Sequence, residues 1–277
     1  MVRPWLKLIR LPNALVAGLG TWLGHACLPG PVDWAAAAIG SAAMALLAAG
    51  GNAHNDLLDL AADRVNRPDR PLPSGRISLR AAAWTAGILY AASFAAAFAL
   101  GPAQGYLTLG MGFLLALYNV RLKALPLAGN LAVALLCAFA VYFPEFPGGP
   151  VHTGIPALFA LLTTMAREIA KDAEDMPGDR AVGWKTFPIA FGPAPTRAAV
   201  AALALITLAL LPIPALVPAD PPYHRAYWVL AAPGPAALLV WCLRGILSRE
   251  PRWGRIQRGL KWIMLAGMIS ILAGVRL

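Results

Sequence analysis

Acidic side chains gather in two short segments of the 277-residue chain, and their spacing is the strongest chemical signal in the sequence. Residues four apart lie on one face of a helix, so Asn55, Asp59 and Asp63 are predicted to form a single helical stripe beside Asp56. A second stripe is predicted further along the chain. It consists of Glu168, Asp172, Asp175 and, if the helix continues past Pro177, Asp179.

Carboxylate and amide oxygens at this spacing suit one kind of ligand. They are hard donors of the type that Mg²⁺ prefers, and Mg²⁺ usually binds through one or two carboxylates together with the phosphates of a substrate. Like charges this close repel one another, so each stripe requires a cationic partner. Lys and Arg residues flank both stripes. The two segments therefore predict a magnesium site that holds a diphosphate.

The composition defines the class of protein that must position these groups. Hydrophobic residues make up 59% of the chain and charged residues only 13%, with a mean hydropathy of +0.63. A soluble domain carries about 25% charged residues. These values exclude a disordered, collagenous or disulfide-framework protein and argue against a soluble enzyme. They predict a polytopic membrane protein, in which acidic residues at membrane depth mark a functional site by default.

Apolar stretches of about 20 residues are long enough to cross a bilayer as helices. We predict nine of them in an all-α bundle around a central cavity, and the short connections between them leave no room for a second domain within residues 1–277. The predicted spans are roughly 12–29, 34–56, 79–99, 103–121, 125–143, 155–176, 191–217, 226–247 and 258–275.

The basic residues predict how the bundle is oriented. With nine spans, all of the 23 Lys and Arg residues except Arg225 and Arg276 fall on one side of the membrane. The positive-inside rule then places the N-terminus in the cytoplasm of a multi-pass cell-membrane protein. The net charge of +10 is explained in this way by orientation and by anionic membrane lipids, and no nucleic-acid partner is expected.

The two acidic stripes are predicted to reach the same depth. The second span covers 22 residues from Asp33 to Asn55, or about 33 Å, and the sixth covers 20 residues from Ile155 to Asp175, or about 30 Å. Both stripes therefore arrive at the cytoplasmic rim of a hydrocarbon core of about 30 Å. Diphosphate-binding groups above an apolar bundle predict an intramembrane prenyl transferase. A transporter or lipid-binding protein is the alternative from another class, but its carboxylates would be expected near mid-membrane.

The sequence around these residues resembles the UbiA-type intramembrane prenyltransferase superfamily over nearly the whole chain, and nine spans match that fold. Asn55-Asp56-x-x-Asp59-x-x-x-Asp63 is similar to its first aspartate motif and Asp172-x-x-Asp175-x-x-x-Asp179 to its second. Neighbouring residues are similar too. The residues at these positions most resemble those of the digeranylgeranylglyceryl phosphate synthases, a subfamily that makes the second ether bond of archaeal-type lipids. These residues are Gly51-Asn52, the segment from Asn66 to Arg76, Tyr118-Asn119-x-Arg121-Leu122-Lys123, Gly129-Asn130, Arg167-Glu168 and Thr186-x-Pro188.

The resemblance implies roles for individual residues. It implies that two Mg²⁺ ions bridge the diphosphate to Asn55, Asp59, Asp63, Asp175 and Asp179, with Asp56 and Asp172 as further ligands or supporting groups. It also implies that charge on the leaving diphosphate is neutralised by Arg67, Lys123 and Lys171.

An allylic carbocation then meets the acceptor in a site that excludes water, and Tyr118 is a candidate for stabilising the cation with its ring. Many members of the superfamily carry a Tyr-x-x-x-Lys pair near the diphosphate. Here Lys123 follows Tyr118 by five residues with Arg121 between them, so either base is a candidate for that role.

The resemblance implies transfer of a geranylgeranyl-type chain from its diphosphate to a glycerol-phosphate lipid such as geranylgeranylglyceryl phosphate. The alternative is an aromatic acceptor in quinone, haem or chlorophyll biosynthesis. A phosphate-bearing acceptor requires additional basic groups near the site. The residues predicted to bind substrate are Arg10, Asn52, Arg67, Arg70 and Lys185.

The segment from Asn66 to Ser78 has two possible interpretations. Pro68, Pro71 and Pro73 stiffen it and Gly75 permits a turn, and the flanking motif favours a lid over the active site, with a rigid connector as the alternative. Arg76 in this segment is assigned either to phosphate or to lipid headgroups, whereas the basic residues from Arg244 to Lys261 are expected to face headgroups.

Overall fold

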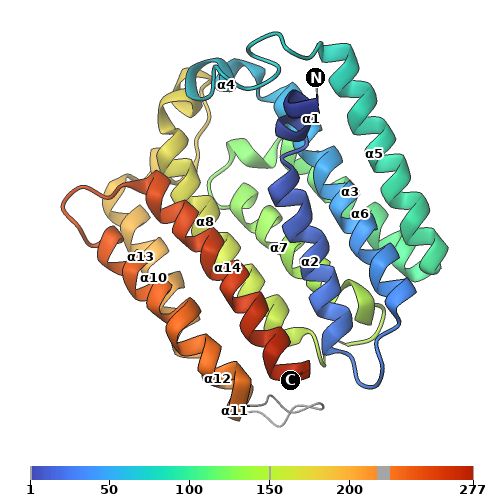
Figure 1. Cartoon of the computed structure of the whole chain (residues 1–277). Coiled ribbons are helices and arrows are strands. Elements are labelled where there is room, and N and C mark those ends of the chain that lie inside the picture. Colours follow the sequence, from blue (N-terminus) through green and yellow to red (C-terminus); the bar gives the residue numbers. More distant parts are fainter. Residues whose placement is uncertain (1, 150, 217–224, 277) are drawn as a thin grey trace.

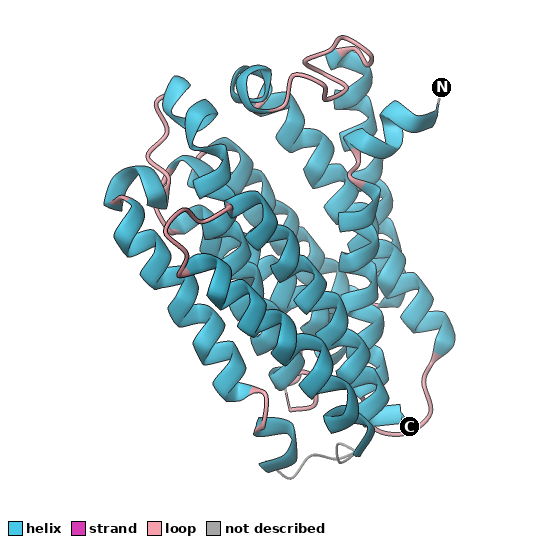
Figure 2. Ribbon diagram, turned by 60° about the vertical axis from the view of Figure 1, so that its left-hand side comes forward, coloured by secondary structure: helices cyan, strands magenta, loops and turns pink. Residues whose placement is uncertain are grey.

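The computed structural model describes residues 2–149, 151–216 and 225–276, and within these ranges all regular structure is helical (Figures 1 and 2). The longer helices are α2 (Leu11–Cys27), α3 (Trp34–Leu58), α5 (Leu79–Leu100), α6 (Pro102–Val120), α7 (Ala128–Tyr142), α8 (Gly154–Ala181), α10 (Pro193–Leu210), α13 (Ala237–Ile246) and α14 (Trp253–Arg276). The short ones are α1 (Val2–Leu8), α4 (Leu60–Asn66), η1 (Leu122–Ala124), η2 (Phe143–Glu145), α9 (Phe187–Phe191), α11 (Ile213–Leu216), α12 (Arg225–Ala231) and the π-helical turn η3 (Ala232–Ala236).

Each predicted apolar stretch coincides with a helix, although the last residue of the predicted 191–217 span lies outside the described residues. Six helical segments of the described chain are long and apolar enough to cross a membrane. They are Trp34–Leu58, Leu79–Leu100, Ala128–Glu145, Pro193–Leu210, Arg225–Ile246 and Trp253–Val275. The prediction of an all-α, multi-pass membrane protein is therefore confirmed.

The outer surface of the bundle is apolar. On α5, Trp84 and Ile88 are 65% and 64% exposed, and the buried residues of that helix are the small ones Ala82, Ala86, Ser93 and Ala97. A soluble protein does not present contiguous large apolar side chains in this way. These side chains are placed where lipid would surround the protein, whereas the charged groups described below point inward.

Small residues allow the helices to approach closely. Gly24 on α2 faces α7, where an added Cβ atom would lie 2.1 Å from the carbonyl oxygen of Val141. Only glycine fits at such a contact. Packing of small residues against neighbouring backbones is the main source of helix association in lipid, because lipid tails are as apolar as the side chains.

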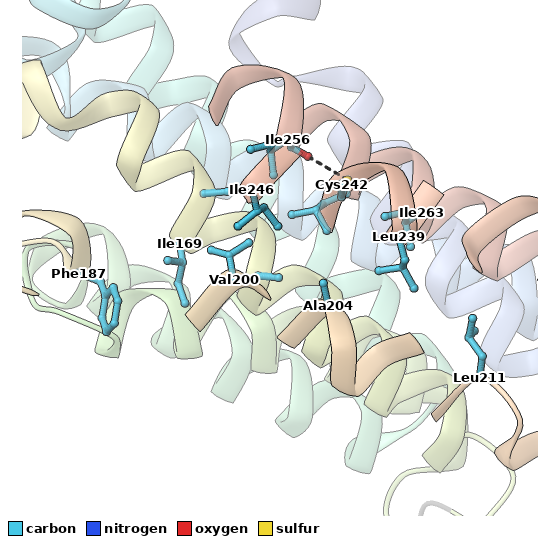
Figure 3. Close-up of a cluster of buried hydrophobic side chains, with 13 residues drawn as sticks. Ile169, Phe187, Val200, Ala204, Leu211, Leu239, Cys242, Ile246, Ile256 and Ile263 are labelled. Carbon is cyan, nitrogen blue, oxygen red and sulfur yellow. Dashed lines mark hydrogen bonds between the residues drawn. The ribbon is translucent and has the colours of Figure 1, made fainter. Parts of the chain in front are cut away.

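A core of branched side chains supports α8 from one side (Figure 3). Ile169 and Ala170 on α8 pack there against Val200 of α10 and Leu260 of α14. The neighbouring α8 residue Lys171 is turned toward a polar cavity instead. This core therefore fixes which face of α8 carries the acidic motif into the interior.

The two acidic stripes differ from the prediction in one respect. The first stripe is not carried by a single helix: α3 ends at Leu58, Asp59 is the linking residue, and α4 begins at Leu60. The spacing survives because the amides of Asp59 and Asp63 still donate to the carbonyl oxygens of Asn55 and Asp59, at 2.9 and 2.8 Å.

The second stripe lies on one helix, since α8 continues through Pro177 to Ala181. Gly178 follows the proline directly, and its amide donates to the Asn66 side chain of α4. The predicted helix therefore continues past Pro177, and the Asp179 carboxylate lies on the same helix as Asp172 and Asp175.

The acidic ends of both helices lie at the end of the molecule that also holds the N-terminus. Helices α1 and α4 are found at this end, and the C-terminal part of α14 lies at the opposite end in both views (Figures 1 and 2). The architecture thus collects the polar groups over one mouth of an apolar bundle.

Candidate active site

A polar cavity lies between the two aspartate-bearing segments and encloses about 620 Å³ of empty space, part of it open to solvent. Its lining comes from distant parts of the chain, and most of it is charged. The lining residues with polar side chains are Arg10, Asn55, Asp59, Asp63, Asn66, Arg70, Tyr118, Lys123, Asn130, Glu168, Lys171, Asp172, Asp175, Asp179, Trp184 and Thr186.

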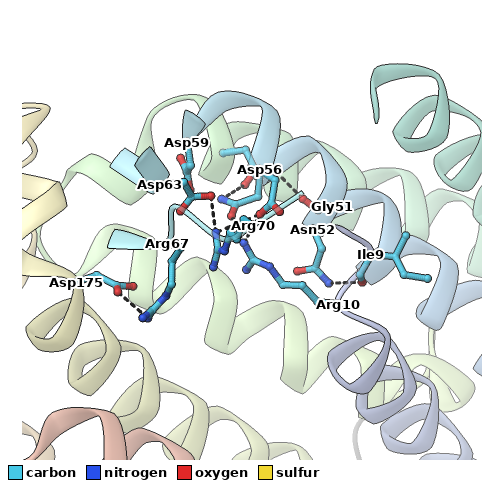
Figure 4. A network of polar contacts seen from close by, with 12 residues as sticks. Ile9, Arg10, Gly51, Asn52, Asp56, Asp59, Asp63, Arg67, Arg70 and Asp175 are labelled. Carbon is cyan, nitrogen blue, oxygen red and sulfur yellow. Dashed lines mark hydrogen bonds and ion pairs between the residues drawn. The ribbon is translucent and has the colours of Figure 1, made fainter. Parts of the chain in front are cut away.

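Two arginines neutralise the first acidic group (Figure 4). Arg10, in the left-handed backbone conformation just before α2, donates to Asp56 at 2.5 Å and to Asn55 at 2.9 Å. Arg70 donates to Asp63 at 2.5 Å and to Asp56 at 3.3 Å. Asp56 is almost fully buried behind these guanidinium groups and does not line the cavity, so its position is that of a supporting carboxylate.

Arg70 comes from the Pro-rich segment between α4 and α5. Leu72 and Ile77 anchor this segment in a buried cluster with Leu8 of α1, and Gly75 makes its turn at φ 71°. The segment is therefore a packed connector that also supplies a charged side chain to the cavity.

Lys123 on η1 reaches the cavity and forms an ion pair with Asp59. Its ammonium group also lies 5.0 Å from the centre of the Trp184 ring, within range of a cation–π interaction. Arg121, the other candidate base, is the exposed residue that ends α6 and lines neither this cavity nor the apolar chamber described below. Of the two candidate bases, the structure therefore brings Lys123 to the cavity and leaves Arg121 outside it.

The second acidic group has its own partners. Asp175 pairs with Arg67 at 2.8 Å, Asp172 accepts from Asn130 of α7 at 2.7 Å, and Asp179 accepts from Thr186 at 3.4 Å. Arg67 is one-third exposed at the rim of the site.

An asparagine joins the helices that carry the two motifs. Asn66 on α4 donates to the backbone carbonyl of Asp175 and accepts from the amide of Gly178, each at 2.9 Å. A Cβ atom at Gly178 would lie 2.2 Å from the Asn66 amide nitrogen. These bonds fix the distance between the two acidic groups.

Glu168 occupies the floor of the polar cavity and is shared by two cations. Arg167 donates to it at 2.5 Å and Lys171 at 2.6 Å, and the carboxylate is buried. One negative charge thus faces two positive charges, which leaves the floor with a positive excess.

Below this floor lies an apolar chamber of about 1300 Å³. Arg10, Asn55, Tyr118, Glu168 and Lys171 line both spaces and form the junction between them. Side chains such as Met44, Leu47, Met111, Leu115, Leu136, Met264 and Met268 line the chamber. A molecule with a polar head and an apolar tail would have each part in a matching environment.

Two of the predicted substrate-binding residues, Asn52 and Lys185, and one residue predicted to face lipid headgroups, Lys261, have particular positions. Asn52 lines the apolar chamber and donates to the carbonyl oxygen of Ile9 at 3.1 Å, so it fixes the turn that presents Arg10. Lys185 is exposed and lies outside both spaces. Lys261 departs from the expected headgroup position, because it lines the chamber and donates to Asn13 at 2.6 Å.

Several residues of the site are uncharged, and their spacing in the sequence did not predict a role for them. Asn119 accepts from the side chain of Asn55 at 3.0 Å and donates to the carbonyl oxygen of Gly51 at 3.3 Å. Asn130, Trp184 and Thr186 make the contacts described above. Asn119, Asn130 and Thr186 belong to the segments that carried the resemblance, which was the available signal.

The oxygen donors of the cavity match the ligand preference of Mg²⁺. Five carboxylates and one carboxamide of the two motifs line the cavity, all with hard oxygen donors. Among the described residues no three acidic, His or Cys side chains are close enough together to hold a metal ion. Each of the five carboxylates is instead paired with a basic or polar side chain. Burial raises the pKa of Asp63 above its ordinary range, because the desolvated charged form is disfavoured even with Arg70 beside it. The residues fit Mg²⁺ in type and number.

Gly129 provides a test of how strictly the position of Lys123 matters. A Cβ atom at Gly129 would lie 2.8 Å from the Cα atom of Lys123 and 2.9 Å from the carbonyl oxygen of Leu122, so Gly129→Ala must displace η1. We expect a stability loss of about 1–3 kcal/mol together with reduced activity. Thermal unfolding in detergent measures the first effect. Gly110→Ala, where an added Cβ has open space, is the matched control, and equal behaviour of the two variants would contradict the argument.

Comparison with known proteins agrees with this geometry. The model of the UbiA prenyltransferase family matches residues 15–264. The chain is 36% identical to digeranylgeranylglyceryl phosphate synthase of Methanopyrus kandleri over 277 residues, which covers 99% of this chain and 100% of that relative.

Two solved structures are similar in fold. The first comes from a structural and mechanistic study of digeranylgeranylglyceryl phosphate synthase in membranes, with a TM-score of 0.75, 26% identity and coverage of 99% and 98% of the two chains. The second is a UbiA homologue from Archaeoglobus fulgidus bound to GPP and Mg²⁺, with a TM-score of 0.72, 22% identity and coverage of 97% and 99%.

Proposed function

The chain belongs to the UbiA prenyltransferase family, and from this premise we propose that it transfers a geranylgeranyl-type group from a prenyl diphosphate to a glycerol-phosphate lipid such as geranylgeranylglyceryl phosphate. The chemistry is alkyl transfer inside a membrane. The relatives at 34–38% identity named digeranylgeranylglyceryl phosphate synthase support this acceptor class.

One observation carries the proposal: the polar cavity adjoins the apolar chamber, and five residues line both spaces. A diphosphate needs the first environment and a long prenyl chain the second. The reacting carbon, which joins these two parts, would then lie at the junction beside Tyr118. A transporter of small ions has no need of such a chamber.

Mg²⁺ fits the donor set, and we propose that Asn55, Asp59, Asp63, Asp175 and Asp179 hold it, with Asp172 and the buried Asp56 in supporting positions. When bound, the metal neutralises the diphosphate and stabilises it as a leaving group. The Mg²⁺-bound homologue from Archaeoglobus fulgidus supports this choice of cofactor.

The basic side chains of the cavity complete the neutralisation. Lys123 and Lys171 face the cavity from η1 and α8, on either side of the space between the two motifs. As the bond between carbon and oxygen breaks, negative charge grows on the diphosphate, and positioned ammonium groups lower the energy of that state. We assign the role left open between two bases to Lys123, because Arg121 is exposed outside the cavity.

The apolar chamber protects the reactive carbon. Water would trap an allylic cation, and side chains such as Leu115, Leu136 and Met111 leave little polar surface where water could bind. Tyr118 is placed at the junction, where its ring would face the cation while excluding solvent.

For the membrane topology we propose nine spans with a cytoplasmic N-terminus and active site. Three helices beyond the six most apolar ones complete the set: α2, α6 and α8. The two ends of the chain lie at opposite ends of the bundle, as an odd number of spans requires (Figures 1 and 2). The basic residues around the site support the cytoplasmic assignment.

An acceptor panel tests the proposed reaction. Purified protein in detergent is incubated with labelled geranylgeranyl diphosphate, Mg²⁺ and either geranylgeranylglyceryl phosphate or an aromatic acid. We expect prenylated lipid from the phosphate-bearing acceptor, no product from the aromatic acid, and loss of product when EDTA removes the metal.

Product with the aromatic acid alone would overturn the acceptor assignment while leaving the prenyl transferase intact. Product formation that is unaffected by EDTA would contradict the metal assignment.

A further inference from the structure

Two cations on facing helices line the apolar chamber without belonging to either aspartate motif. Arg167 extends from α8 and Lys261 from α14, and both are part of the chamber wall. Charged groups at this depth are costly and are retained where a partner or ligand compensates them. The other lysine and arginine of the chamber wall, Lys171 and Arg10, are paired with Glu168 and Asp56.

Neither of these two cations is satisfied by a carboxylate of its own. The Nε atom of Arg167 is buried and has no hydrogen-bond partner among the described residues, and the Nη1 atom shares Glu168 with Lys171. Lys261 donates to the neutral amide oxygen of Asn13 on α2. The pair therefore carries about one unneutralised charge or more into a low-dielectric wall.

The register of α8 against α14 places Arg167 and Lys261 at the same level of the bundle, and both side chains line the chamber. Near the rim, Gly254 on α14 lies against the Glu174 carboxylate of α8. Nearer the other end, the Thr164 hydroxyl contacts the Met264 sulfur at 4.0 Å. The two helices run in opposite directions. Arg167 is seven residues before Glu174 and Lys261 is seven residues after Gly254, so the first contact predicts that the two residues are level. The second contact predicts the same, because Arg167 is three residues after Thr164 and Lys261 is three residues before Met264.

This level lies below the diphosphate site. Seven residues along α8 from Glu174 correspond to about 10 Å. Arg167 is one helical turn below Lys171, which lines both the polar cavity and the chamber. An anion bound by Arg167 and Lys261 would therefore lie beside the junction, outside the space enclosed by the two aspartate motifs.

We propose that Arg167 and Lys261, positioned by Glu168 and Asn13, bind the phosphate monoester of the acceptor lipid. This inference rests on the proposed function. The diphosphate of the donor is already accounted for by the two motifs and their bases, so a second anionic group is needed to match the second positive site. In a glycerol-phosphate acceptor the phosphate lies only a few bonds from the hydroxyl that reacts. A phosphate held beside the junction would direct that hydroxyl toward the prenyl carbon.

Steady-state kinetics with both substrates tests the assignment. We expect Arg167→Gln and Lys261→Gln each to raise KM for geranylgeranylglyceryl phosphate about 10-fold or more, because each removes a hydrogen bond between charged groups. KM for geranylgeranyl diphosphate should change less than about 2-fold. Lys261→Arg should retain most of the acceptor affinity, and Arg258→Gln, an exposed residue one turn away on α14, is the matched control. An equal rise in both KM values, or no rise in the acceptor KM, would overturn the assignment.

A binding measurement separates this inference from the reaction itself. The thermal shift of the wild-type protein is recorded without Mg²⁺ or donor, in the presence of geranylgeranylglyceryl phosphate, its dephosphorylated alcohol, inorganic phosphate, or a phosphodiester lipid. We expect stabilisation by the phosphorylated acceptor above that by the alcohol, and loss of this difference in both Gln variants. If the wild type makes no product with this acceptor but the difference persists and depends on the pair, only the reaction assignment fails. Equal shifts with acceptor and alcohol, or a preference for the phosphodiester lipid, would overturn the phosphate site.

Discussion

Replacing Asp59 by asparagine is expected to lower kcat of prenyl transfer about 100-fold or more. The change keeps the size of the side chain but removes a negative charge that lines the polar cavity and faces Lys123. Carboxylate oxygens supply most of the binding energy for Mg²⁺, and even residues that only support a metal ligand typically cost 10–100-fold when changed. The rate is measured with saturating donor and acceptor over a range of Mg²⁺ concentrations, and the Mg²⁺ requirement should rise.

Asp69→Asn is the matched control for this experiment. Asp69 is an acidic residue of the segment that follows α4, but its side chain is 80% exposed and lies 4.0 Å from Lys7. We expect less than a 2-fold effect on kcat there. An Asp59→Asn variant with wild-type kcat and Mg²⁺ dependence would contradict the assignment of the first motif to the metal.

Replacing Lys123 by methionine is expected to lower kcat by about 100- to 1000-fold, the usual cost of removing one preorganised donor to developing negative charge. Methionine keeps the length and the apolar stem, so the contact with Trp184 is largely retained while the charge is lost. Arg121→Met, two residues earlier in the chain, should leave kcat within about 2-fold because its side chain points to the outside. The ratio of the two variant rates is the measurement, and similar losses in both would contradict the placement of Lys123.

A double variant separates catalysis from simple structural support. Asp59 and Lys123 form a largely buried ion pair, and removing one member leaves the other charge uncompensated, at a cost of about 3–5 kcal/mol in stability. If the pair were only structural, Asp59→Asn combined with Lys123→Met would restore both thermal stability and activity. We expect stability to recover and activity to stay low, because both groups act on the diphosphate.

The local chemistry of this protein was readable from the sequence. The i, i+4 spacing of Asn55, Asp59 and Asp63 survives the break between α3 and α4, because backbone hydrogen bonds continue the turn through Asp59. The apolar stretches located most ends of the long helices to within about five residues, since a membrane segment must satisfy its own backbone hydrogen bonds.

The sequence could not predict which side chains reach the cavity, because this depends on how the helices rotate and pack. Lys123 and Arg121 are two residues apart and have equal charge, yet Lys123 lines the cavity and Arg121 is exposed outside it. In the same way Lys185 was expected near substrate but is exposed, whereas Lys261 was expected at headgroups but lines the chamber.

The sequence alone therefore determined the membrane-embedded helical class, the two aspartate groups and the kind of ligand they suit, because those follow from composition and from spacing along one helix. Only the tertiary structure decided which charges meet. Asp56 is enclosed by Arg10 and Arg70, which lie 46 and 14 positions away in the chain, and Arg167 and Lys261 line the same chamber from two different helices. Such pairings are fixed by the packing of small residues at helix crossings, which no local pattern records.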